Sequence, residues 1–123
     1  MSDEQQIRSV IFTYFDALYH GDVAAFRRVL HPQVQLFSAT GGELVHLSLE
    51  PYMEMVAGRP SSASRSDPRE DEVVSVTIAS PTTAHGRVKD MYLPKRFVNE
   101  LSFIKISGRR QIACKVWHFE FGS

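Results

Sequence analysis

The order of the secondary-structure patterns is what most constrains this chain. Its second half reads as four long strands in series, each rich in β-branched or aromatic residues: 71–79, 83–93, 96–106 and 109–121. Short separators such as Pro94-Lys95 and Ser107-Gly108 are typical of hairpins. Four hairpin-connected strands predict an antiparallel meander, and one face of such a sheet must be buried against other elements.

Helical patterns in the first half of the chain predict the elements that would bury this face of the sheet. Apolar residues at three- and four-residue spacing predict a first helix capped at Ser2 or Asp3 and ended by Gly21. Two shorter helices are predicted, from Asp22 to His31-Pro32 and from Ser48 to Gly58, with short strands near 34–38 and 44–47 between them. The sequence therefore predicts one α+β domain over residues 1–123. Its N-terminal helices would pack in a strongly curved antiparallel sheet, a cone-shaped α+β barrel.

Charge and cysteine content exclude several functional classes. Lysine plus arginine and aspartate plus glutamate each total 14, so no net charge draws the chain to nucleic acid or to a membrane surface. The single cysteine, Cys114, excludes an intrachain disulfide, and the five histidines show no metal-binding spacing. We therefore expect no metal and no cofactor. The polar N-terminus and the lack of a long apolar run predict a cytoplasmic protein without a signal peptide or spanning helix.

Asp90 is the most distinctive candidate site residue. Strand alternation places it on one face with Ala84, Gly86 and Val88, so its carboxyl group is expected inside the sheet. Without a partner, burial would raise its pKa and make it a usable proton donor. In the alternative interpretation it pairs structurally with Arg96 or Arg110. Tyr92 and Asn99 are expected to add polar contacts from neighbouring positions.

The last predicted strand is apolar on both faces. Ile112, Cys114 and Val116 alternate toward His118, which could therefore line the cavity or simply sit at its rim. The opposite row carries Trp117, Phe119 and Phe121 and is interrupted by Lys115. We expect this aromatic row to form a homodimer interface on the outer sheet face. Alternatively, it closes one end of the barrel.

Several segments resemble a known superfamily. The stretch Tyr-Phe-Asp-Ala-Leu-Tyr-His-Gly-Asp at 14–22, followed by Leu-His-Pro at 30–32, resembles the opening of nuclear transport factor two-like proteins. Residues 47–60 and 101–109 are similar to its branch named "putative lumazine-binding", which is also polyketide-cyclase-like (SnoaL-type). The resemblance implies a curved sheet closed by helices, an internal ligand pocket and a homodimer.

One enzyme of that superfamily allows a comparison of residues. Ketosteroid isomerase uses an aspartate base facing a tyrosine and a protonated aspartate. Tyr14 matches the tyrosine by its spacing to the turn at Gly21-Asp22, but the position of the base falls on Ser38. A serine hydroxyl is no base near neutral pH without a proton acceptor, so the isomerase chemistry is not expected.

The sequence thus predicts a small-molecule-binding protein with an internal pocket for an apolar or aromatic ligand. Candidate ligand-binding residues are Tyr14, Ser38, Tyr52, Asp90, Tyr92, Asn99 and His118. The alternative is an acid–base enzyme of the polyketide cyclase, dehydratase or isomerase type, with Asp90, Tyr14 and His118 as the best catalytic candidates. A third interpretation is an interaction module that takes no ligand.

Overall fold

A computed structural model describes residues 1–122, so residue 123 of the predicted domain lies outside the described residues. The helices are α1 (Asp3–His20), α2 (Val23–Val29) and α3 (Leu49–Ala57). The strands are β1 (Leu30–Ser38), β2 (Val45–Leu47), β3 (Glu72–Ser80), β4 (Thr83–Tyr92), β5 (Lys95–Ile106) and β6 (Arg109–Phe121). Within residues 1–122, none of the helices combines the length and apolarity needed to cross a bilayer.

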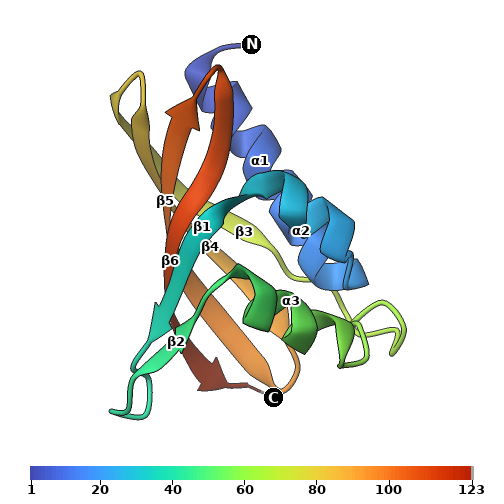
Figure 1. The fold of residues 1–123 in the computed structure, drawn as a ribbon. Coiled ribbons are helices and arrows are strands. Elements are labelled where there is room, and N and C mark those ends of the chain that lie inside the picture. The colour runs from blue at the N-terminus through green and yellow to red at the C-terminus, as the bar shows by residue number, and fades with distance from the viewer. Residues whose placement is uncertain (123) are drawn as a thin grey trace.

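The helices cover one face of a curved sheet (Figure 1). Strand order is β2-β1-β6-β5-β4-β3, and β3 to β6 form the predicted antiparallel meander. The α+β prediction is therefore confirmed. The sheet is mixed, however, because β1 pairs in parallel with β6, and no pairing between β2 and β3 closes it into a barrel within the described residues. The pairing of β1 with β6 spans most of the chain, and no local sequence pattern encodes it.

Local chemistry sets both ends of α1 and the start of α2 where the sequence predicts them, but α2 ends at Val29, and the predicted stop His31-Pro32 lies within β1. At the start of α1, the Ser2 hydroxyl accepts from the Gln5 amide, and the Ser2 amide donates to the Gln5 side chain, forming a capping box. Gly21 ends α1 with a left-handed φ of 62°. The Asp22 side chain then accepts from the Ala25 amide and starts α2.

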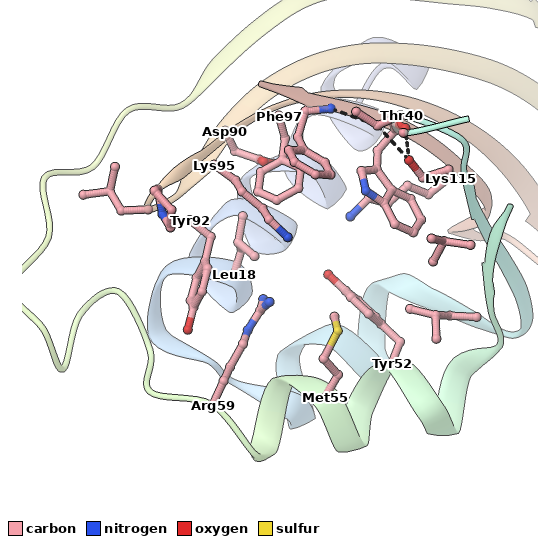
Figure 2. Close-up of a pocket in the computed structure, with 18 of the residues that line it drawn as sticks. Leu18, Thr40, Tyr52, Met55, Arg59, Asp90, Tyr92, Lys95, Phe97 and Lys115 are labelled. Atoms are coloured by element: carbon pink, nitrogen blue, oxygen red, sulfur yellow. Dashed lines mark hydrogen bonds between the residues drawn. The ribbon is translucent and has the colours of Figure 1, made fainter. Parts of the chain in front are cut away.

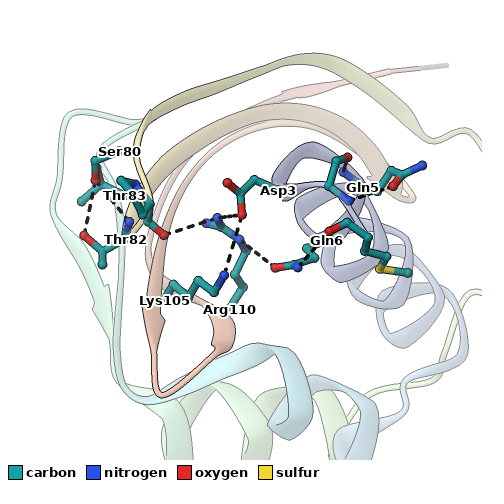
Figure 3. A network of polar contacts seen from close by, with 11 residues as sticks. Asp3, Gln5, Gln6, Ser80, Thr82, Thr83, Lys105 and Arg110 are labelled. Carbon is teal, nitrogen blue, oxygen red and sulfur yellow. Dashed lines mark hydrogen bonds and ion pairs between the residues drawn. The ribbon is translucent and has the colours of Figure 1, made fainter.

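A polar clasp fixes the start of α1 to the sheet. The side chain of Arg110 on β6 is only 2% exposed and donates from Nη2 to Asp3 Oδ1 at 2.7 Å and from Nε to Gln6 Oε1 at 3.3 Å (Figure 3). Lys105 adds a second positive charge 3.7 Å from the same carboxylate. The hydrogen bond from Arg110 lowers the pKa of Asp3. This arginine is therefore committed to α1, far from the candidate site at Asp90.

Close packing between α1 and the sheet depends on Gly86. A β-carbon built on Gly86 would lie 3.2 Å from Phe103 Cε2 and 3.3 Å from Ile11 Cδ1. Ile11 and Phe103 both belong to the single cluster of buried apolar side chains formed by the helices and the inner sheet face. The missing side chain thus lets α1 approach β4 and β5.

We predict that Gly86→Val lowers the free energy of unfolding by about 1–3 kcal/mol, because a branched side chain overfills the space beneath α1. Urea unfolding measures this change. Gly41→Val is the control, since nothing lies within 4 Å of the equivalent position on that loop glycine. Equal stability of the two variants would contradict the close approach.

Candidate functional site

A β-bulge in β6 determines which side chains of this strand point into the interior of the protein, on either side of the bulge. Phe103 pairs with Ile112 and Ser102 pairs with Cys114, which leaves Ala113 as an extra residue. The two-residue alternation shifts by one position there. Ile112 therefore points into the core, and after the bulge Lys115, Trp117 and Phe119 point inward in place of Cys114, Val116 and His118.

The shift reverses the facing that alternation alone predicts for His118 and for the aromatic row of β6. The His118 side chain is 59% exposed and lies 3.8 Å from Glu120, so it does not line the cavity. Trp117 and Phe119 line the cavity, so their side chains are not available for a dimer interface on the outer face. Phe121 is 72% exposed at the end of the strand. The alternative, in which the aromatic row closes one end of the interior, matches Trp117 and Phe119 better.

A cavity of about 640 Å³ opens between α3, β2 and the inner face of β4 to β6 (Figure 2). Its apolar and aromatic wall is formed by Leu18, Val45, Leu47, Tyr52, Met55, Tyr92, Leu93, Pro94, Phe97, Trp117 and Phe119. Its ionisable groups are Glu43, Arg59, Asp90, Lys95 and Lys115. This size and mixture are typical of a pocket for a small organic molecule. Among residues 1–122, no cluster of three or more side chains is arranged to hold a metal ion.

Asp90 lies at the inner end of this cavity. Its side chain is buried, and the Asn99 amide donates to Oδ2 at 2.8 Å. Burial raises the pKa of Asp90 to about 6, while the positive charge of Lys115 and the hydrogen bond from Asn99 limit the rise. The two arginines considered as partners pair elsewhere, Arg96 with Glu70 and Arg110 with Asp3.

Tyr14 lies one layer behind the cavity wall. It is completely buried and packs edge-to-face on Phe26. Among residues 1–122, its hydroxyl group has no hydrogen-bond partner of normal geometry. Burial raises the pKa of Tyr14 well above its usual value, and the nearby Tyr52 and Asp90 raise it further. Tyr14 is therefore a neutral phenol that can donate a hydrogen bond but cannot serve as a base.

Lys115 was not predicted as a site residue. It is 6% exposed, and its ammonium lies 5.4 Å from the ring centre of Tyr14 and 5.2 Å from those of Tyr52 and Trp117. These distances are within cation–π range, so aromatic rings surround the charge. The clue in the sequence was the charged residue that interrupts the aromatic row of the last strand.

Arg59, which follows α3, also lines the cavity and lies against Tyr92. Its guanidinium carbon lies 4.0 Å from the centre of the Tyr92 ring, and the Tyr92 hydroxyl donates to the Pro60 carbonyl at 2.6 Å. Arg65 lies 4.4 Å from the same ring and pairs with Asp67. The polar segment that follows α3 is thus tied to the end of β4.

The structure brings together only part of the predicted ligand-binding set. Ser38, Tyr52, Asp90 and Tyr92 line the cavity, whereas Tyr14 and Asn99 lie behind it and His118 faces outward. The Ser38 hydroxyl donates to the Trp117 carbonyl at 2.8 Å, so it bridges β1 and β6. Sequence reasoning missed Arg59, Lys95 and Lys115.

The chain belongs to the family described as "Putative lumazine-binding", whose model matches residues 2–118. The fold is similar to that of an NTF-2 like protein of unknown function from Silicibacter pomeroyi (20% identity, 98% of this chain and 100% of that chain, TM-score 0.85). It is also similar to a ketosteroid isomerase-like protein from Erwinia carotovora (14% identity, 99% and 100% covered, TM-score 0.75). No curated protein matches the sequence.

Asp90 makes stability depend on pH. Its pKa is about 6 in the fold against an ordinary 3.8, so the native state binds the proton more tightly and loses stability as pH rises through this window. Asp90→Asn removes that cost. Relative to wild type, we expect the variant to gain about 1–3 kcal/mol between pH 4 and pH 8.

Urea unfolding at several pH values measures this gain. Glu54→Gln, a change at an exposed position on α3, is the control and should leave the wild-type pH profile unchanged. A constant difference between Asp90→Asn and wild type across the whole range would show that the buried carboxyl titrates normally.

Proposed function

We propose that this chain binds a small, largely apolar or aromatic molecule in the cavity beside Asp90 and Lys115. The observation that carries the proposal is the opening of two buried charged side chains onto an apolar cavity of about 640 Å³. Burying charge is costly, and such groups are retained where they contact a ligand or each other. Membership of the "Putative lumazine-binding" family supports a ligand-binding fold.

The role of each side chain follows from its place in the cavity. Tyr52 and Trp117 offer flat apolar faces, and Asp90 offers a hydrogen-bond acceptor when ionised or a donor when protonated. Asn99 fixes the orientation of the carboxyl group by its hydrogen bond. From behind the wall, the Tyr14 ring lies 5.4 Å from the Lys115 ammonium and contributes to its aromatic surroundings.

Trp117 gives a direct test, because it is the only tryptophan in the chain and lines the cavity. We predict that the neutral dye N-phenyl-1-naphthylamine gains fluorescence with the protein and quenches Trp117 by energy transfer. Trp117→Phe should keep the dye signal and lose the tryptophan signal. A folded protein that leaves the dye unchanged would refute the proposed cavity. Native mass spectrometry of freshly purified protein then identifies any bound molecule and reports the oligomeric state.

A second candidate function, acid–base catalysis, is favoured by the pKa of about 6 at Asp90. At pH 7.5 the carboxylate can accept a proton from carbon, while the electron pair of the C–H bond moves to a carbonyl oxygen and forms an enolate. Lys115 lies near enough to stabilise developing negative charge. The similarity to a ketosteroid isomerase-like protein supports this candidate through fold alone.

We predict that, if this second function holds, the protein speeds deuterium exchange at the carbon next to the carbonyl of 2-tetralone in D₂O. Nuclear magnetic resonance follows the exchange. The rate should fall below pH 6 as Asp90 is protonated, and it should fall to the buffer rate in Asp90→Asn. An equal rate in wild type and Asp90→Asn would assign no catalytic role to this carboxylate.

A further inference from the structure

Three positive side chains from separate elements point into the same cavity. Arg59 follows α3, Lys95 begins β5 and Lys115 lies on β6, and their charged ends face the same space (Figure 2). Within residues 1–122, none of the three makes a side-chain ion pair or hydrogen bond. Their contacts are with aromatic faces: Arg59 with Tyr92, Lys95 with Phe119, and Lys115 with its three rings.

The charge balance of the cavity is positive. Against the three cations, the lining contains two carboxylates, Glu43 and Asp90. Glu43 is exposed on the loop between β1 and β2, whereas Asp90 is buried at the inner end. Asp90 is near enough to Lys115 for their charges to interact, but no ion pair joins them. An anion entering the cavity would therefore meet more positive than negative charge.

The arrangement also suits a particular kind of anion. The guanidinium carbon of Arg59 lies 4.0 Å from the centre of the Tyr92 ring, and within residues 1–122 no ion pair occupies its nitrogens, so they are available for the two oxygens of a carboxylate. The walls between the cations are aromatic, with Tyr52, Phe97, Trp117 and Phe119 among the lining residues. Flat rings pack on such walls, and the low-dielectric surroundings strengthen the charge contacts.

We infer that this cavity selects aromatic monocarboxylates over neutral molecules of the same shape, with Lys115, Arg59 and Lys95 binding the carboxylate. This inference rests on the proposed function, since it names the class of ligand for the same cavity. It assigns the apolar walls to affinity and the three cations to selectivity.

A matched pair of ligands tests the selectivity. The protein is loaded with N-phenyl-1-naphthylamine and titrated with 2-naphthoate or with its neutral analogue 2-naphthamide. We expect 2-naphthoate to displace the dye at roughly tenfold lower concentration, the effect of one charge-assisted contact. Lys115→Met, which keeps an unbranched side chain one atom shorter and removes its charge, should bring the two ligands to within about threefold.

Lys89→Met is the matched control, because Lys89 is exposed and lies outside this cavity, and it should keep the full preference for 2-naphthoate. If Lys115→Met does not fold, Arg59→Gln tests the same point and should reduce the preference severalfold. Equal displacement by 2-naphthoate and 2-naphthamide in wild type would overturn the inference while leaving the proposed function standing. Failure of the dye itself to bind would overturn both.

Discussion

The extra residue at Ala113 is the constraint on which the site depends. Before it, β6 contributes Ile112 to the core that α1 covers, and after it the same strand contributes Lys115 and Trp117 to the cavity. A regular strand would have turned Cys114, Val116 and His118 inward and left the aromatic row outside. The partner strand β1 changes register at the same place, between Leu30 and Gln35. The bulge thus separates the half of the interior that is packed against α1 from the half that contains the cavity.

The hollow half stays open because its large side chains are braced by other contacts. Tyr92 is fixed by its hydrogen bond to Pro60 and by two arginines over its ring. Tyr52 packs edge-to-face on Phe26, which belongs to the core. Side chains that are held in this way cannot collapse into the space between them, whereas free ones would fill it to reach the packing density of an ordinary interior. The cavity is therefore a consequence of how its walls are anchored.

The sequence predicted what local physical chemistry decides. Caps at Ser2, Asp22 and Gly21 set the helix ends, and alternation placed Asp90 inside the sheet. The sequence could not predict the parallel pairing of β1 with β6, because this pairing joins distant segments. Nor could it predict the bulge, because a strand that is apolar on both faces does not indicate which face points inward. The misplacement of His118 and of the aromatic row follows from that single ambiguity. The sequence showed Lys115 as a charged residue that interrupts an aromatic row. Its inward position could be recognised only from the bulge, which determines which side chains of β6 point inward.

The same bulge also brings the buried charge of Lys115 close enough to interact with that of Asp90. Asp90 lies on β4 and Lys115 on β6, with Asn99 of β5 between them donating to the carboxylate. Had Lys115 faced outward, only Asn99 would oppose the effect of burial on Asp90, and its pKa would lie above 6. Conversely, without Asp90 the lysine would have only aromatic faces to offset its desolvation. Because they lie near each other without forming an ion pair, each charge lowers the cost of burying the other and still leaves room for a ligand between the walls.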